Sequence, residues 1–226
     1  MKRFLIFFLI LSLIFNFCAC SNVKNGKTIR IGIIDSCISP EIQNKYNIVQ
    51  VNDIVGVKTD NNITHGSMIL SIISKNVPNC EIFYCSVLNE KCNGKIQDVA
   101  NAIDWCISNK VDIITMSFAT LTDDDQIRKS VEEAIKSNII ITASCVNLSD
   151  VVCYPAMYNG VISVSEGFNT RAQIILKGKK VKFEIDGTEF EKREVSFLTA
   201  YVCGSIAKQL SDGKTIEAIL KKHDFN

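Results

Sequence analysis

Three polar residues stand at the edges of apolar runs in this 226-residue chain, and their side chains could act together. Asp35 directly follows the apolar run 31–34, while His65 and Ser196 each open a segment with helical spacing. A hydroxyl becomes a useful nucleophile when an imidazole takes its proton and a third group orients that base. Each residue also has a purely structural interpretation, because Asp is common in turns and Ser is a common helix N-cap. The elements around them must therefore bring them together before any chemistry follows.

Short apolar runs alternate along the chain with amphipathic segments. The predicted strands cover residues 28–34, 81–87, 111–116, 139–143 and 161–164, and the predicted helices between them cover 65–74, 96–108 and 125–137. Continuous apolar strands separated by helices indicate an α/β fold with a parallel sheet that is buried on both faces. Such folds carry their chemistry at the carboxyl ends of the strands, and Asp35 stands at one of these ends.

The region 174–191 departs from this alternation. Gly178 and Gly187 separate the short segments 174–176, 181–185 and 189–190, which predict an antiparallel meander. Two helices, 196–210 and 215–223, are expected to close the chain. We expect one domain over residues 28–226, preceded by a signal peptide at 1–20 and a short linker at 21–27.

Several local sequences resemble the motifs of the subtilisin family of serine peptidases, the subtilases. The matching segments are Ile-Gly-Ile-Ile-Asp-Ser at 31–36, Thr-His-Gly-Ser-Met at 64–68, Ile-Ile-Thr-Met-Ser-Phe at 113–118, Tyr-Pro-Ala at 154–156 and Val-Ile-Ser-Val at 161–164. The resemblance extends from about residue 28 to residue 210. The order Asp, His, Ser along the chain is also that of the subtilisins.

This resemblance implies a three-layer subtilisin-like fold and a set of roles. Asp35, His65 and Ser196 would form the catalytic triad. Asn147 would donate to the oxyanion together with the backbone N–H of Ser196. The substrate cleft would be lined by Ser117, Phe118 and Ala119. The implied reaction is hydrolysis of a peptide or protein, with no cofactor and no metal.

The chain also departs from the family pattern. Around the serine, Glu194-Val195-Ser196-Phe197 keeps the nucleophile but lacks the usual preceding Gly-Thr. We therefore expect a different backbone conformation just before Ser196. Cys37 and Cys145 replace small residues beside predicted catalytic positions. No folding prodomain or calcium-binding loop is recognisable. The missing prodomain suggests a narrow substrate specificity, such as the trimming of one peptide.

The N-terminus reads as an export signal. Lys2 and Arg3 precede the apolar run 4–15, which falls short of the roughly 20 residues that a spanning helix needs. Ala19 before Cys20 resembles a lipoprotein signal, in which Cys20 would be lipidated. We therefore expect the protein outside the cell, either secreted or tethered to the outer face of the membrane.

Eight cysteines remain after the signal, an even number that permits disulfides in an exported protein. The best local pairs are Cys145 with Cys153 and Cys85 with Cys92, although few or no bridges are expected. No Cys-x₂-Cys pair supports a zinc site.

The net charge of +1 gives no electrostatic indication of a nucleic-acid partner, and we expect a monomer. Two alternatives to an active peptidase stay open. One is a degenerate subtilisin fold that acts as a binding or regulatory module, and the other is a cysteine-dependent protein that uses Cys37 or Cys145 with a depressed pKa.

Overall fold

The computed structural model describes residues 26–222 and residue 225. The predicted signal peptide, most of the predicted linker and the predicted lipidation site Cys20 lie outside these described residues. None of the helices in the described part of the chain is long and apolar enough to cross a membrane.

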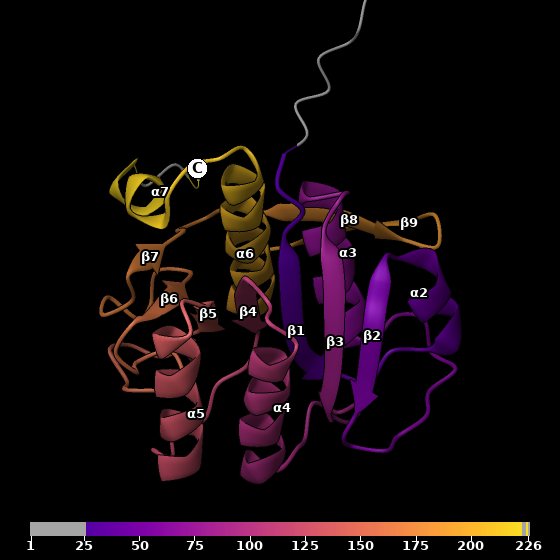
Figure 1. Ribbon diagram of the computed structural model, residues 1–226, viewed down its shortest axis with the longest axis horizontal. Helices are drawn as coiled ribbons and strands as arrows, with labels where there is room; N and C mark the ends of the chain where they lie inside the picture. The colour runs from indigo at the N-terminus through magenta and orange to yellow at the C-terminus, as the bar shows by residue number, and fades with distance from the viewer. Residues whose placement is uncertain (1–25, 223–224, 226) are drawn as a thin grey trace, which may run out of the picture.

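A seven-stranded parallel sheet forms the middle layer, in the order β2-β3-β1-β4-β5-β6-β7. Its strands are β1 (Arg30–Ser36), β2 (Ile48–Asp53), β3 (Glu81–Leu88), β4 (Ile113–Met116), β5 (Ile140–Ser144), β6 (Val161–Ser165) and β7 (Ile174–Ile175). The sheet is parallel throughout, so the carboxyl ends of its strands all lie along one edge. The α/β fold with a mostly parallel central sheet, predicted from the alternation of strands and helices, is confirmed (Figure 1).

Helices form the two outer layers. They are α2 (Pro40–Lys45), α3 (His65–Asn76), α4 (Ile96–Ser108), α5 (Asp125–Lys136), α6 (Val195–Ser211) and α7 (Ile216–Lys222). Alternate residues of β1 point to opposite faces. Ile33 belongs to a core cluster with α3 and α6, and Ile34 to a second cluster with α4 and α5. The sheet is therefore buried on both sides.

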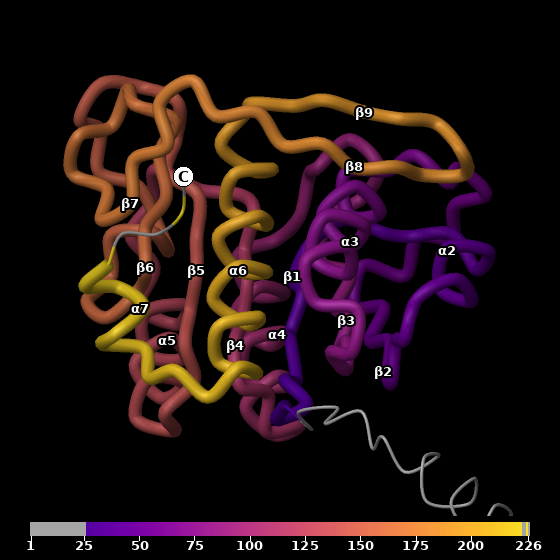
Figure 2. The backbone as a smooth tube through the Cα atoms, turned by 90° about the horizontal axis from the view of Figure 1, so that it is seen from above, coloured from indigo at the N-terminus to yellow at the C-terminus, as the bar shows by residue number. Residues whose placement is uncertain are grey.

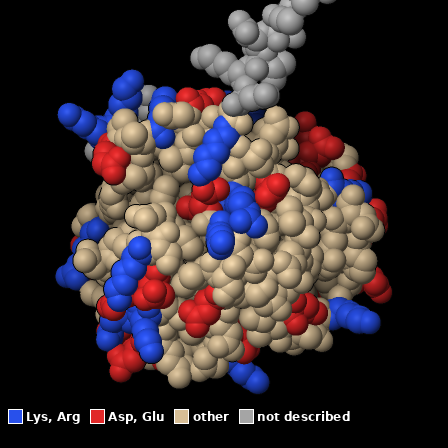
Figure 3. Space-filling model, viewed as in Figure 1, with Lys and Arg blue, Asp and Glu red and all other residues tan. Residues whose placement is uncertain are grey.

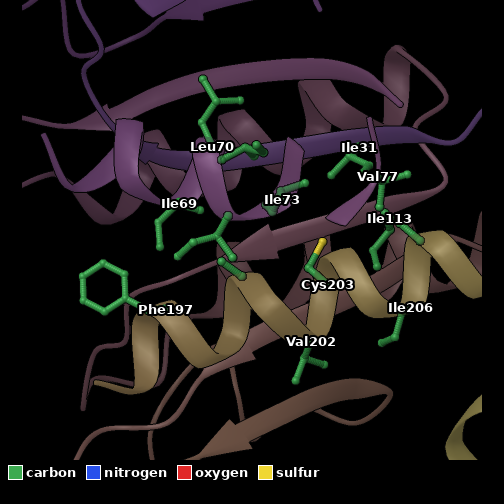
Figure 4. Close-up of a cluster of buried hydrophobic side chains, with 14 of the residues drawn as sticks. Ile31, Ile69, Leu70, Ile73, Val77, Ile113, Phe197, Val202, Cys203 and Ile206 are labelled. Carbon is green, nitrogen blue, oxygen red and sulfur yellow. The ribbon is translucent and has the colours of Figure 1, made fainter. Parts of the chain in front are cut away.

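The layer between the sheet and α6 is mostly apolar. Ile73 of α3 and Cys203 of α6 are both buried in the space between the two helices and β1 (Figure 4). Cys203 packs here as a small hydrophobic residue, as the sequence pattern predicted. Close packing holds α6 rigidly against α3, and these two helices carry predicted catalytic residues at their starts.

On the opposite face, α4 approaches β1 very closely at one glycine. A Cβ atom added to Gly32 would come within 2.7 Å of the Sγ of Cys106. A glycine is therefore required at position 32 because a side chain would not fit, and not because of its backbone conformation, since Gly32 has no positive φ angle. This contact fixes the distance of α4 from the strand that ends in Asp35.

A two-stranded antiparallel hairpin, β8 (Val181–Ile185) and β9 (Thr188–Lys192), packs against α3 (Figure 2). The predicted three-segment meander is therefore partly wrong. Its first segment became β7, which pairs in parallel with β6 at the edge of the main sheet. Ile174 is buried there against the core, and that burial favours the sheet edge over the hairpin.

Two elements were not predicted from the sequence, α2 and β2. The edge strand β2 has a burial pattern with three half-buried and three exposed residues, so it lacks the continuous apolar run of the other strands. The helix α2 has only six residues. On the face shown in Figure 3, positive and negative side chains are interspersed, with no large area of one sign.

Candidate active site

Asp35 and His65 are brought into direct contact at the carboxyl edge of the sheet. Asp35 lies near the end of β1 and is fully buried. Its Oδ1 lies 2.7 Å from the Nδ1 of His65 and also accepts the backbone N–H of Ser36 at 2.7 Å. Its Oδ2 has no hydrogen-bond partner among the described residues. The carboxylate is thus fixed with one oxygen turned to the imidazole.

His65 is held by the start of α3. Thr64 is the N-cap, and it exchanges hydrogen bonds with Ser67: the Thr64 side chain accepts the Ser67 N–H, and the Ser67 hydroxyl accepts the Thr64 N–H. This capping box fixes the backbone on both sides of His65. The imidazole itself stays 21% exposed at its side chain, so it faces the surface.

The environment of His65 favours its protonated form. Burial of the ring opposes protonation, but the charge of Asp35 and the hydrogen bond to it outweigh that effect, so the pKa of His65 is raised above its ordinary value. An imidazole with a raised pKa is a better proton acceptor.

Gly66, next to the histidine, fits only because it lacks a side chain. Its N–H donates to the hydroxyl of Ser36 at 2.8 Å, and an added Cβ would lie 1.9 Å from the hydroxyl oxygen of Tyr84. That tyrosine is buried and donates to the Ser36 carbonyl at 2.6 Å. Ser36 and Tyr84 therefore hold the start of α3 against the end of β1. Tyr84 is not among the predicted site residues, although a tyrosine inside an otherwise apolar strand is a visible signal.

Ser196 is the second residue of α6 and lies beside the end of β4. The N-cap of α6 is Glu194, which makes no capping hydrogen bond with its side chain, so the structural interpretation of Ser196 as an N-cap is wrong. The Ser196 hydroxyl donates to the carbonyl of Ser117 at 2.8 Å, and the Ser117 hydroxyl donates to the carbonyl of Ser196 at 3.1 Å. No hydrogen bond joins Ser196 to His65 in the described structure.

Phe197, the residue after Ser196, packs beside the ring of His65. The Phe197 ring lies 5.7 Å from the His65 ring, centroid to centroid, and stacks on Phe183 of β8 at 5.9 Å. Phe183 stacks in turn on Phe190 of β9 at 5.3 Å. The hairpin thus supports the start of α6 and one side of the imidazole.

The predicted substrate and oxyanion residues lie along the same edge. Ser117 is buried, and Phe118 and Ala119 after it are half-buried. The next residue, Thr120, pairs in both directions with Tyr154, at 2.8 Å each way. Asn147 lies in the segment after β5, the neighbour of β4, and it is exposed.

The modified serine motif carries two bulky residues, Glu194 and Phe197. Glu194 is exposed, and its carboxylate accepts the backbone N–H of Arg193. Phe197 is buried against the hairpin. The Ser144 hydroxyl is hydrogen-bonded to Thr199 at 2.8 Å, which ties the end of β5 to α6.

Neither Cys37 nor Cys145 has the properties of an activated nucleophile. Burial and then the charge of Glu90 raise the pKa of Cys37, and a hydrogen bond to Cys153 followed by burial raises the pKa of Cys145. The alternative of a cysteine-dependent protein required a depressed pKa at one of these two residues, so these shifts do not support it.

All eight cysteines in the described part of the chain are free thiols, and the two suggested local pairs are not bridged there. Among the described residues, no group of His, Cys, Asp or Glu could hold a metal ion.

Comparison with known proteins gives the family of this chain. A model of the subtilase family matches residues 26–210. This chain belongs to the subtilase family. Minor extracellular protease Epr of Bacillus subtilis is 29% identical over 217 residues, 88% of this chain. Subtilisin DY of Bacillus licheniformis is 23% identical over 85% of this subtilase and 80% of its own length.

The chain spans less than half the length of two of these relatives, although the fold is shared with solved structures. The chain spans 33% of the length of Epr and 41% of the length of Subtilisin E. A cold-adapted subtilisin-like serine proteinase shares the fold with a TM-score of 0.68 at 20% identity, over 83% of this chain and 77% of its own. The prenylagaramide maturation protease PagA gives 0.66 at 19% identity, over 84% and 79%. The subtilisin-like fold predicted from the motifs is therefore confirmed.

Proposed function

We propose that this subtilase is an active serine endopeptidase with Asp35, His65 and Ser196 as its triad. The observation that carries the proposal is the 2.7 Å contact between Asp35 and His65 at the sheet edge where α6 presents Ser196. A buried carboxylate on one ring nitrogen leaves the other nitrogen free to act as a base. The substrate would be a peptide or protein, and the enzyme would act as a monomer.

The first step requires a rotation of the Ser196 hydroxyl. In the structure it donates to the Ser117 carbonyl, and it would turn to His65 when a substrate enters. Catalytic hydrogen bonds often tighten only in the substrate complex. The Ser196 oxygen would then form a bond to the scissile carbonyl carbon while the proton passes to His65, and His65 would return that proton to the leaving amine.

Stabilisation of the developing oxyanion would come from two donors. The backbone N–H of Ser196 lies in the first turn of α6, where N–H groups lack partners within the helix. Asn147 lies in an exposed segment one strand away and could supply its side-chain amide. Ser117, Phe118 and Ala119 would pair with the substrate backbone. Water would then form a bond to the acyl carbon while its proton passes to His65. The bond to the Ser196 oxygen would break as His65 returns that proton to the serine.

Export fits the N-terminal sequence and one relative. Residues 2–20 carry the features of a signal, and Epr is named an extracellular protease. We propose that the protein acts outside the cell, either secreted or held at the membrane through a lipid on Cys20.

One observation favours the second candidate, a binding or regulatory module on a degenerate subtilisin fold. The reciprocal hydrogen bonds between Ser196 and Ser117 leave the nucleophile without a bond to the histidine. A module of this kind would bind peptides in the cleft and release them uncleaved.

Cleavage of β-casein separates the two candidates. Wild-type protein should produce new peptides, detected by mass spectrometry, and Ser196→Ala should produce none. Ser205→Ala is the matched control, because Ser205 lies on the same helix, nine residues beyond Ser196. If folded wild-type protein binds casein and leaves it uncleaved, the binding module replaces the peptidase.

A further inference from the structure

Two buried cysteines flank the segment that carries Asn147. Cys145 is 1% exposed at the end of β5, and Cys153 is fully buried just before Tyr154. The backbone N–H of Val146 donates to the Sγ of Cys153 at 3.3 Å. Because Val146 N is bonded to the carbonyl carbon of Cys145, this places the Cys153 sulfur within about 6 Å of the Cys145 Cα. The two side chains are therefore neighbours in the fold, as a disulfide between them requires.

Both ends of the intervening segment, residues 146–152, are anchored. The Cys145 N–H donates to the Val164 carbonyl at 2.8 Å, and Tyr154 pairs with Thr120. Between these anchors, residues 147–150 are exposed, and Leu148 exposes 53% of its surface. The segment covers the two sulfurs from solvent. Besides its ends it is held at Asp150, whose carboxylate accepts the Thr170 N–H at 2.9 Å, and at Val151, whose carbonyl accepts the Asn169 side-chain amide at 2.7 Å. The stretch around Asn147 and Leu148 is therefore its least anchored part.

We propose that Cys145 and Cys153 are a thiol–disulfide exchange site, which reacts with low-molecular-weight disulfides and, once oxidised, locks segment 146–152. The effect on catalysis that follows rests on the proposed function, since it acts through Asn147.

The two sulfurs have unequal roles in the exchange. The hydrogen bond from Cys145 lowers the pKa of Cys153 to about 7, although burial works against this, and Val146 N–H also favours the thiolate. Cys153 is therefore the attacking sulfur and Cys145 the resolving one.

With glutathione disulfide as the oxidant, the Cys153 thiolate forms a bond to one sulfur and releases one glutathione thiolate, which takes the Cys145 proton. The Cys145 thiolate then attacks the Cys153 sulfur of the mixed disulfide and releases the second glutathione. The protein dithiol loses two electrons, and glutathione disulfide gains them as two glutathione molecules.

The lock would act on the oxyanion donor. A crosslink between residues 145 and 153 removes conformational freedom from the seven residues between them, including Asn147. Ordering one mobile polar side chain in advance is worth about two- to tenfold in rate. We expect the oxidised protein to react with a fluorophosphonate faster than the reduced protein by that factor.

The test uses the full chain, treated with glutathione disulfide or with dithiothreitol. Non-reducing peptide mapping should find Cys145 linked to Cys153 in the oxidised sample, and hydrogen exchange in residues 146–152 should slow at least threefold. Cys145→Ser and Cys153→Ser should lose both effects. Cys92→Ser is the matched control, because Cys92 is exposed in another loop, and it should keep both.

The two proposals fail separately. Alkylation of both cysteines in folded, oxidised protein, or a linkage elsewhere, overturns the exchange site whatever the activity. A linked protein whose segment exchanges hydrogen as before overturns the lock. A linked and slowed protein that never reacts with a fluorophosphonate upholds the exchange site and overturns the proposed peptidase.

Discussion

At the scale of single residues, the account depends on the contact between Asp35 and His65. The carboxylate is fully buried, accepts from Ser36 and lies 2.7 Å from the imidazole. A buried carboxylate in this position orients the ring and stabilises its protonated form during the reaction. The raised pKa of His65 is the measurable sign of that interaction.

The pH dependence of activity follows from this shift. His65 must be neutral to accept the serine proton, so the rate of fluorophosphonate labelling should fall as the pH drops through the raised pKa of His65. Asp35→Asn removes the charge that raises this pKa, so the midpoint should move to lower pH. The plateau rate should also fall by about 10⁴-fold, the loss seen when a triad aspartate becomes asparagine. A midpoint that stays unchanged in Asp35→Asn would contradict the pairing.

Gly66 tests the seating of the histidine. In Gly66→Ala, the new Cβ would meet the Tyr84 hydroxyl at 1.9 Å and the Ser36 carbonyl at 2.6 Å. The start of α3 would have to shift, and we expect a loss of about 1–3 kcal/mol in the free energy of unfolding, measured in urea. Labelling of Ser196 should fall with it. A free energy of unfolding within about 0.5 kcal/mol of wild type would contradict the prediction that no side chain fits at position 66.

At the scale of elements, the β8–β9 hairpin supports the site through aromatic stacking. Phe190, Phe183 and Phe197 form a continuous stack that ends beside His65. Phe183 is 1% exposed, so its removal would leave a cavity under the start of α6. The hairpin thus contributes to the position of both Ser196 and His65.

Phe183→Ala is expected to lower the free energy of unfolding by about 3–5 kcal/mol, because a large buried ring is lost. The matched control is Phe168→Ala, since Phe168 is 56% exposed and should change stability by less than about 0.5 kcal/mol. Urea unfolding of both variants makes the comparison. Equal effects of the two substitutions would contradict the supporting role of the stack.

At the scale of the whole molecule, much of the fold was predictable from residue patterns. The runs that became β1, β3 and β4 are largely apolar and buried almost throughout, because helices cover both faces of the sheet. The edge strand β2 was missed since it is only half-buried, and the segment of β7 was assigned to the hairpin since two residues carry almost no periodicity.

The candidate site was predictable in its residues and less so in its contacts. Motifs around Asp35 and His65 located both partners of the 2.7 Å contact. The hydrogen bond from Ser196 to the Ser117 carbonyl could not be predicted, because it depends on a side-chain rotation and on how α6 meets β4. The supporting role of Phe183 depends on packing between segments distant in sequence, which a local motif does not encode.

The most direct test of the account is the site of fluorophosphonate attachment. Wild-type protein should gain one adduct, and peptide mapping should place it on Ser196. Ser196→Ala should gain none, while Ser205→Ala should react like wild type. Folded wild-type protein that stays unlabelled, or that carries the adduct on another residue such as Ser117, would contradict the assignment of Ser196 as the nucleophile.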